Sequence, residues 1–316
     1  MKILIADKFP QHWQDVLAQN NQITFAPKLD ENTLPAEIKD NEILIVRSTK
    51  VTPAVIDAGV ALKLIIRAGA GYDTIDTAYA AKKGIAVCNC PGTNSLAVAE
   101  LAMALMLALD RRIYNNVRDL RDGKWNKSEY SKARGIFGKK LGILGFGNIG
   151  KAVAKRAAAF GLDIYVYDPY AKEEVLAQFN VKRVNDVYEL AKTVDIITVH
   201  LPSTEETKGL FNKKFFDTMK DGAYFINTAR GNLVNTKDLV EVLKSGKIRA
   251  ALDVYENEPK ATDTVFDKTV FEGLENFYGT HHIGASTDQA QDAVAEMAVQ
   301  IVNEYGKNKT FLHKVN

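Results

Sequence analysis

The chain has 316 residues, of which 46% are hydrophobic and 25% are charged, and its formal net charge is +2. This length suggests two domains, each large enough to bury its own core. The near-neutral charge and the absence of a long basic run argue against nucleic acid or a membrane surface as a partner. The longest nearly apolar run, Leu96–Leu109, is too short to cross a bilayer core of about 30 Å. The first residues, MKILIAD, indicate a strand rather than a signal peptide.

Strand and helix signals alternate from the start of the chain. The expected strands are Ile3–Ala6, Ile23–Phe25, Ile43–Val46, Leu62–Arg67 and Ile85–Cys88, and the expected helices are His12–Gln19, Leu34–Lys39, Pro53–Ala58 and Ile75–Lys82. This alternation predicts a parallel sheet with helices on both faces. One long helix follows, from about Ser95 to Asp122, and its apolar part would be buried on nearly every side.

Two features of this first part concern ligands and redox state. Gly69, Ala70 and Gly71 follow a predicted strand, where consecutive N–H groups can form either an anion-binding nest or an ordinary strand-ending turn. The two cysteines, Cys88 and Cys90, lie on alternate positions of one strand, so a disulfide between them is not expected. Reduced thiols suggest a cytoplasmic protein.

The segment Gly145–Gly150, GFGNIG, carries the strongest local signal. The apolar strand Leu141–Leu144 precedes it, the Ala-rich helix Lys151–Phe160 follows it, and a second strand, Asp163–Asp168, ends in an acid. This order of strand, glycine turn, helix, strand and acid is the fingerprint of a dinucleotide-binding βαβ unit.

Each glycine of this segment has a separate role. Gly145 permits the tight turn, Gly147 lets the backbone approach a pyrophosphate, and Gly150 lets the helix pack closely on the strand. The N–H groups and positive dipole end of the helix would then face the phosphates. The Asp168 carboxylate can accept hydrogen bonds from the adenosine ribose and would repel a ribose phosphate, which favours NAD over NADP. Alternatively, Asp168 merely caps a strand before Pro169.

The second half of the chain repeats the alternation of strands and helices. Further strands are expected at Ile196–Val199, Ala223–Ile226 and Ala250–Val254, and a helix at Thr236–Ser245. A last helix begins at Ser286–Gln289, where the serine hydroxyl and the glutamine side chain can form a capping box. The sequence therefore predicts a second α/β unit, which contains the glycine turn.

Three segments at predicted strand ends carry candidate catalytic residues. Arg230 follows the first strand, Asp253 and Glu258 follow the second, and His281 and His282 belong to the third segment. Ligands of parallel sheets bind beyond the carboxyl ends of the strands, so these side chains are expected to converge near a nicotinamide. Oxidation of a 2-hydroxy acid needs a histidine as base, a carboxylate that orients it and an arginine for the substrate carboxylate. Taken singly, each residue can instead be structural or solvated.

The chain resembles the D-isomer-specific 2-hydroxyacid dehydrogenases over essentially its whole length, and within them most closely the phosphoglycerate dehydrogenases. The resemblance rests on VRSTKVTPAVID, RAGAGYDTID, NSLAVAELAMALML, LGILGFGNIG, DIITVHLPSTEETKGL, FINTARGNLV, ALDVYENEP and HHIGASTDQAQ. It implies an oxidoreductase with NAD as cofactor and no metal. The alternatives are a glyoxylate or hydroxypyruvate reductase, another D-2-hydroxyacid dehydrogenase, or an NAD-sensing binding module similar to transcriptional corepressors.

The family's catalytic residues fall on Arg230, Glu258 and His282. The resemblance implies that the glutamate pairs with the histidine and that the arginine holds the substrate carboxylate. Many members have proline where this chain has His281, and we take His282 as the base because it keeps the spacing to Gly284. The residues implied at the cofactor are Gly145, Gly147, Asn148, Ile149, Gly150, Asp168, Thr228, Ala229, Asp253 (at the nicotinamide amide), Gly284 and Ala285.

The implied reaction is the oxidation of D-3-phosphoglycerate to 3-phosphohydroxypyruvate, the first step of phosphorylated serine biosynthesis. A phosphorylated substrate needs cations away from the hydride site. The positions implied for substrate binding are Arg47, Lys50, Arg67, Gly69, Ala70 and Gly71, and Lys127, Lys132 and Arg134 in a later loop could assist. For any one of these basic residues, a solvated surface charge is an equally good interpretation.

The resemblance also implies an α/β architecture of two doubly wound parallel-sheet domains. A Rossmann NAD-binding domain, residues 95–283, would be inserted into a flavodoxin-like substrate-binding domain made of residues 1–94 and 284–316. The region of the helix Leu96–Leu109 is expected to form a homodimer, with a small-molecule substrate as the other partner. Longer phosphoglycerate dehydrogenases end in a serine-sensing domain, and since this chain stops soon after His282, feedback by serine is not expected.

Overall fold

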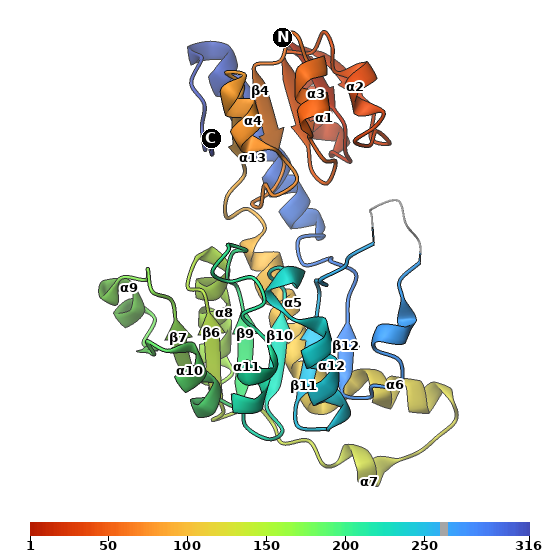
Figure 1. The fold of residues 1–316 in the computed structure, drawn as a ribbon, viewed down its shortest axis with the longest axis vertical. Helices are drawn as coiled ribbons and strands as arrows, with labels where there is room; N and C mark the ends of the chain where they lie inside the picture. Colours follow the sequence, from red (N-terminus) through yellow and green to blue (C-terminus); the bar gives the residue numbers. More distant parts are fainter. Residues whose placement is uncertain (260–264) are drawn as a thin grey trace. The chain divides into compact units, whose positions relative to one another are not determined.

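The computed structural model describes residues 1–259 and 265–316. The chain folds into two compact units, which are described separately below. Unit 1 comprises Met1–Asn94 and Ala285–Asn316, and unit 2 comprises Ser95–Gly284 (Figure 1). Gly284, expected in the substrate-binding domain, belongs to unit 2, because its N–H group donates to the Asp253 carboxylate of that unit at 2.8 Å. None of the helices in the described ranges is both long enough and apolar enough to span a membrane.

Unit 1 contains a five-stranded sheet in the order β2-β1-β3-β4-β5, and every pairing between these strands is parallel. This is the flavodoxin-like strand order. The strands are β1 (Lys2–Ile5), β2 (Gln22–Phe25), β3 (Ile43–Val46), β4 (Leu64–Arg67) and β5 (Ala86–Asn89). The three inner strands β1, β3 and β4 are almost continuously apolar, because helices cover both faces of the sheet.

The helices of unit 1 divide between two apolar cores. Helices α1 (Gln11–Ala18) and α13 (Asp288–Asn308) pack on one face of the sheet. Helices α2 (Leu34–Glu37), α3 (Pro53–Ala58) and α4 (Thr77–Lys82) pack on the other. The last helix therefore completes the unit that the first part of the chain begins.

Unit 2 contains a seven-stranded sheet, again with parallel pairings throughout, in the order β12-β11-β10-β9-β6-β7-β8. Counted along the chain, this is the Rossmann order, which reverses between β6 and β9. The strands are β6 (Lys140–Leu144), β7 (Asp163–Tyr167), β8 (Lys182–Arg183), β9 (Ile196–Val199), β10 (Tyr224–Asn227), β11 (Arg249–Leu252) and β12 (Phe277–Gly279). The predicted fold class of two doubly wound parallel sheets is confirmed.

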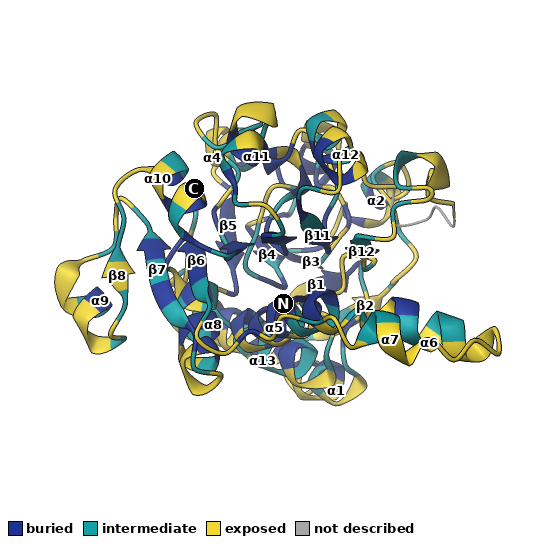
Figure 2. Cartoon of the chain, turned by 90° about the horizontal axis from the view of Figure 1, so that it is seen from below, coloured by how far each residue is buried: buried dark blue, intermediate teal, exposed yellow. Residues whose placement is uncertain are grey.

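Helices also cover both faces of this second sheet. Helices α5 (Ser95–Arg111), α8 (Asn148–Ala159) and α9 (Glu173–Gln178) enclose one core. Helices α10 (Val187–Thr193), α11 (Lys213–Thr218) and α12 (Thr236–Lys244) enclose the other, around four buried phenylalanines that pack mainly edge to face. In Figure 2 the central strands are mostly dark blue, and the outer helices turn yellow faces to solvent. The remaining helical segments are α6 (Ile113–Arg121), α7 (Lys127–Tyr130), and the 3-10 turns Gly231–Leu233 and Lys268–Val270.

The predicted single helix from Ser95 to Asp122 is wrong, because α5 and α6 are separate helices (Figure 1). Arg112 interrupts them in the left-handed conformation, with φ of 52°. In a continuous helix the Leu109 carbonyl would accept from Ile113, but here it accepts from the Arg249 guanidinium at 2.8 Å. The Arg112 guanidinium pairs with Glu129 beyond the helices. Two side chains distant in sequence, those of Arg249 and Glu129, thus bind the groups beside the break between α5 and α6.

The predicted capping box at Ser286–Gln289 is also wrong in detail. The N-cap of α13 is Thr287, whose hydroxyl accepts from the Ala290 N–H group at 3.2 Å. The Ser286 hydroxyl instead accepts from the Arg47 guanidinium at 3.2 Å. The last helix therefore begins one residue later than the pattern indicated, and its preceding serine binds the side chain of Arg47, which directly follows β3.

Candidate active site

The candidate catalytic and cofactor residues of unit 2 follow two groups of neighbouring strands, which β9 separates in the sheet. The glycine turn follows β6 and Asp168 follows β7, while Arg230, Glu258 and His282 follow β10, β11 and β12. Because all these strands are parallel, their carboxyl ends lie at one edge of the sheet. The site is thus built from loops that a rigid sheet holds in place.

The glycine turn between β6 and α8 has the close packing that the fingerprint predicts. Gly145 has φ of +93°, and a Cβ atom there would lie 2.6 Å from the carbonyl oxygen of His200. A Cβ atom on Gly150 would lie 2.1 Å from the carbonyl oxygen of Gly145. A Cβ atom on Gly147, by contrast, would meet no atom within 4 Å. Two glycines are therefore needed by the fold, and the third leaves open space beside the backbone.

This open space fits the pyrophosphate of a dinucleotide. Gly147 is the N-cap of α8 and provides no side-chain cap, so the first-turn N–H groups, which include those of Asn148 and Ile149, face outward without one. At the same sheet edge the Thr228 hydroxyl is buried and has no hydrogen-bond partner among the described residues. An orphaned hydroxyl beside Ala229, at the edge that carries an open helix N-terminus, fits a polar cofactor.

Asp168 is fixed above the glycine turn by backbone groups. One carboxylate oxygen accepts from the Phe146 N–H group at 2.7 Å, and the other accepts from the Tyr170 N–H group at 2.8 Å. The carboxylate therefore caps the turn before Tyr170, the structural role considered above for Asp168. It also places a negative charge beside the glycine turn, where the cofactor would bind. Each oxygen retains a lone pair for a ribose hydroxyl.

Asp253, only 1% exposed, fixes the loop that carries His282. One carboxylate oxygen accepts from the Thr280 hydroxyl at 2.6 Å and from the Ile283 N–H group at 2.9 Å. The other accepts from the Gly284 N–H group at 2.8 Å, and the Asp253 carbonyl accepts from the His282 N–H group at 2.8 Å. One carboxylate oxygen still has room for a second donor, as a nicotinamide amide would require.

Glu258 and His282 form a pair at this edge. The Nδ1 atom of His282 lies 2.7 Å from Oε2 of Glu258, and the histidine side chain is 53% exposed. The backbone of His282 is left-handed, with φ of 53°, a conformation that costs energy for a residue other than glycine. The backbone N–H groups of His282, Ile283 and Gly284, which donate to Asp253, hold the turn in this conformation. His281 is exposed, and its ring has no hydrogen bond within the described ranges.

The pKa of Glu258 lies below its ordinary value. Burial raises this pKa, but the hydrogen bond and charge of His282 outweigh the burial, and the Tyr255 N–H group and the Arg230 charge add to the lowering. Glu258 is consequently ionised near neutral pH. A carboxylate can only accept hydrogen bonds, so a neutral His282 ring carries its proton on Nδ1 and keeps a lone pair on Nε2.

Arg230 is placed near this pair by the close approach of two loops. A Cβ atom on Gly231 would lie 1.9 Å from the Tyr255 carbonyl oxygen, so only glycine lets the loop after β10 meet the loop after β11. The buried Asn227 side chain braces the same loop, since it donates to the Arg230 carbonyl at 2.8 Å and accepts from the Ala229 N–H group at 2.9 Å. The structure thus brings the guanidinium, the carboxylate and the imidazole to one edge.

The cations proposed for the substrate lie in unit 1, at the carboxyl ends of β3 and β4. The Arg47 guanidinium donates to Gln291 and Ser286, both at 3.2 Å, and the N–H groups of residues 47–49 all donate to the Asp7 carboxylate. The Nζ atom of Lys50 lies 3.9 Å from Oε2 of Glu31. The Arg67 guanidinium lies against Gly69, since a Cβ atom on this glycine would be 1.5 Å from the Nη1 atom of Arg67. The Ala70 carbonyl accepts from Asn89, and Gly71 stands beside it in the same loop.

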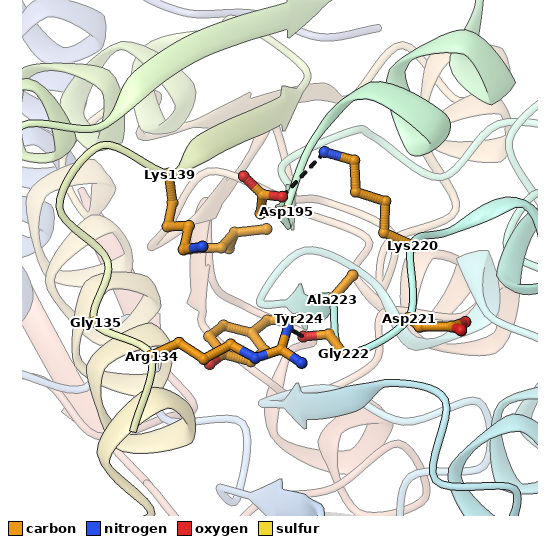
Figure 3. Close-up of a pocket in the computed structure, with 10 residues that line it drawn as sticks. Arg134, Gly135, Lys139, Asp195, Lys220, Asp221, Gly222, Ala223 and Tyr224 are labelled. Atoms are coloured by element: carbon orange, nitrogen blue, oxygen red, sulfur yellow. Dashed lines mark hydrogen bonds and ion pairs between the residues drawn. The ribbon is translucent and has the colours of Figure 1, made fainter. Parts of the chain in front are cut away.

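The suggestion that the loop before β6 assists substrate binding is wrong for Arg134. This residue lines a hollow with Lys139, Asp195 and Lys220 (Figure 3). Lys139 and Asp195 immediately precede β6 and β9, so the hollow lies at the amino ends of the strands, opposite to the candidate site. Within the same loop, Lys132 pairs with Glu129 at 2.6 Å.

Sequence reasoning missed three residues that support the site, namely Asn227, Tyr255 and Thr280. Their side chains brace the loops of Arg230 and His282. The available signal was weak, because a polar or aromatic residue at a strand end has many possible roles. Only the pairing of β10, β11 and β12 shows that these residues act on neighbouring loops.

Known proteins resemble this chain in sequence over the whole of unit 2 and beyond it. Residues 103–284 match the family model of the D-isomer specific 2-hydroxyacid dehydrogenase, NAD binding domain. The chain is 45% identical to the hydroxypyruvate reductase of Thermotoga maritima, over 88% of this chain and 89% of that protein. It is 40% identical to the D-3-phosphoglycerate dehydrogenase of Methanocaldococcus jannaschii over its full length, but spans only 59% of that relative.

A solved structure is similar over the whole chain. The NAD+-bound 3-phosphoglycerate dehydrogenase of Entamoeba histolytica superimposes with a TM-score of 0.83 at 28% identity, covering 100% of this chain and 98% of that one. The cofactor of unit 2 is NAD, in keeping with the matched domain. The chain belongs to the family of D-isomer-specific 2-hydroxyacid dehydrogenases.

Proposed function

We propose that the chain is an NAD-dependent dehydrogenase of D-2-hydroxy acids and that its substrate is D-3-phosphoglycerate, which it oxidises to 3-phosphohydroxypyruvate, the first step of phosphorylated serine biosynthesis. The observation that carries the proposal is the Glu258–His282 pair, with 2.7 Å between its atoms, at the sheet edge that also presents the open glycine turn. An oriented imidazole beside a dinucleotide site is the arrangement that transfer of a proton together with a hydride requires.

The three residues have distinct roles in this reaction. Nε2 of His282 takes the hydroxyl proton of the 2-hydroxy acid while the hydrogen on C2 leaves as hydride, and it returns that proton in the reverse reaction. NAD, when bound, accepts the hydride. Glu258 keeps the ring in the required tautomer and stabilises the imidazolium that forms. The Arg230 guanidinium binds the substrate carboxylate through paired hydrogen bonds and so orients C2.

The support for a phosphorylated substrate is the cation content of unit 1. Arg47 and Arg67 stand at the ends of neighbouring strands, with Lys50 close by in sequence. Guanidinium groups suit phosphate oxygens, which accept several hydrogen bonds at once. The relatives named as D-3-phosphoglycerate dehydrogenases agree with this assignment.

A substrate panel tests the proposal. Oxidation of NADH would be followed at 340 nm with 3-phosphohydroxypyruvate, hydroxypyruvate, glyoxylate and pyruvate. We expect kcat/KM to be highest for 3-phosphohydroxypyruvate, by about tenfold or more, since a lost charged contact costs roughly 1.5–3 kcal/mol. Equal efficiency with hydroxypyruvate would contradict the assignment of substrate, and no turnover with any acid would contradict the enzyme.

Hydroxypyruvate or glyoxylate reduction is the second candidate, favoured by the 45% identity to a hydroxypyruvate reductase of similar length. Another D-2-hydroxyacid dehydrogenase would share the same three residues. An NAD-sensing module similar to corepressors is the non-enzymatic alternative, and it predicts cofactor binding without turnover.

We also propose a homodimer and a cytoplasmic location. The sequence placed the dimer at the helix Leu96–Leu109, but most apolar side chains of this helix are buried in unit 2. Support for the dimer comes instead from α6, whose Ile113, Tyr114, Val117 and Leu120 are 40–62% exposed although apolar. Support for the location comes from Cys88 and Cys90, both buried and free. Burial raises the pKa of Cys88 to about 11 and that of Cys90 to about 12, so neither thiol is activated.

A further inference from the structure

Tyr255 touches both loops that carry the acid–base pair. Its N–H group donates to Oε1 of Glu258 at 3.0 Å. Its hydroxyl lies 2.8 Å from the Thr280 carbonyl and 3.2 Å from the Leu252 carbonyl. A hydroxyl donates one proton, so the shorter contact, to Thr280, is its main hydrogen bond. Thr280 is two residues before His282, and the tyrosine therefore links the two loops.

The fold makes room for this hydroxyl. A Cβ atom on Gly279 would lie 2.5 Å from it, so the last residue of β12 has to be small. On its other side the ring packs against Phe266 and Phe271, with ring centroids 5.0 and 6.1 Å away. Burial raises the pKa of Tyr255, which keeps the hydroxyl protonated as a donor. The side chain is thus fixed at its ring and at its oxygen.

The second link between the loops runs through Asp253. Its carboxylate accepts from the Thr280 hydroxyl at 2.6 Å, while its carbonyl accepts from the His282 N–H group. Thr280 is therefore held on both sides, by the carboxylate at its side chain and by Tyr255 at its carbonyl. Without the tyrosine hydroxyl, the strained turn at His282 would lose one of these two restraints.

We propose that Tyr255 is a positioning residue, which sets the distance between Glu258 and His282 through its hydroxyl. The inference rests on the proposed function, since the pair is given its role there. Tyr255 does not touch the reacting atoms. It acts on the loop of Glu258 through its backbone and on the loop of His282 through its side chain.

The substitution Tyr255→Phe tests this inference, because it keeps the ring and removes only the hydroxyl. We expect kcat to fall roughly 10- to 100-fold, the effect of small misplacements in active sites, while the Kd for NADH changes less than about twofold. The matched control is Tyr278→Phe, which removes another buried hydroxyl from the neighbouring strand, one that donates to Asn115 on α6. The control should retain its kcat.

A double-mutant cycle separates positioning from general destabilisation. In a Glu258→Ala background the hydrogen bond to His282 is already lost, so adding Tyr255→Phe should lower kcat by less than about threefold. Fully additive losses would overturn the inference. A kcat of Tyr255→Phe equal to that of the wild type would overturn it as well.

A spectroscopic readout keeps the test independent of turnover. The hydrogen-bonded Nδ1 proton of His282 would be assigned in ¹⁵N-histidine-labelled protein by its absence in His282→Asn. We expect Tyr255→Phe to shift or broaden this signal and Tyr278→Phe to leave it in place. If no acid is turned over, the proposed function fails, and an unchanged signal in Tyr255→Phe would still overturn the positioning role.

A second variant addresses the same contact from the other side. Gly279→Ala should displace the hydroxyl and reproduce the kinetic and spectroscopic effects of Tyr255→Phe. Combined with Tyr255→Phe, the alanine should cause less additional loss of thermal stability than it causes alone, because the phenylalanine leaves space for the methyl group. A larger additional loss would overturn the proposed contact.

Discussion

The decisive contact at the scale of single residues is the one between Glu258 and His282. Its strength follows from its setting, because Glu258 also accepts from a backbone N–H group and lies near the Arg230 charge. These contacts keep the carboxylate ionised despite its burial. They also fix which nitrogen of the ring is open to a substrate.

The lowered pKa of Glu258 predicts a pH dependence of stability. The folded-state pKa lies below the ordinary 4.5, so the contribution is complete above pH about 4.5 and is lost as the pH falls through the folded-state value. The difference in free energy of unfolding between wild type and Glu258→Gln should therefore stay nearly constant above pH about 4.5 and shrink as the pH falls further below it. Urea titrations at three pH values would measure it.

His282→Asn provides the matched comparison for this prediction. It removes the main cause of the lowered pKa, so its pH dependence should resemble that of Glu258→Gln. A difference from the wild type that already shrinks above pH about 4.5, or that does not shrink at all below it, would show that the pair does not hold Glu258 ionised.

At the scale of elements, two glycines of the turn after β6 serve different needs, because Gly145 is required by the fold and Gly147 leaves space for a ligand. Gly145→Ala would place a methyl group 2.6 Å from a carbonyl oxygen at positive φ, whereas Gly147→Ala would meet nothing within 4 Å. Gly147→Ala should therefore fold with the melting temperature of the wild type but bind NADH at least about tenfold more weakly, because the methyl group occupies the approach of the pyrophosphate. Fluorescence titration with NADH and thermal melts would measure both effects.

The control for this prediction is Gly145→Ala, which should lose thermal stability as well as binding. If Gly147→Ala bound NADH as the wild type does, the open space beside this residue would not be the pyrophosphate site.

Local patterns predicted most of these elements, because parallel strands covered on both faces are apolar runs separated by turns. The turn at Gly145 was recognisable because its conformation demands glycine. The break at Arg112 was not recognisable, since the Leu109 carbonyl is bound by Arg249, which is distant in sequence. Likewise, the strand ends identified Arg230, Glu258 and His282 as candidates, but the supporting role of Tyr255 depends on how neighbouring strands pair.

At the scale of the whole molecule, the exposed apolar face of α6 predicts association of two chains. Ile113, Val117 and Leu120 follow helical spacing along one side, and Tyr114 lies beside them. Light scattering at micromolar concentration should give twice the mass of one chain, and Leu120→Glu should shift the protein towards the monomer. Val60→Glu, which changes an exposed apolar residue of unit 1, should remain dimeric. A monomeric wild type would contradict the dimer.

The central claim is that His282, held by Glu258, exchanges the proton that accompanies hydride transfer. The most direct measurement compares kcat for NADH oxidation, with the best acid of the panel, among wild type, His282→Asn and His281→Asn at equal folded fraction. We predict a loss of at least about 100-fold for His282→Asn, within the range for a general acid–base residue, and less than about threefold for His281→Asn. A larger loss at His281, or an unchanged kcat in His282→Asn, would contradict the account.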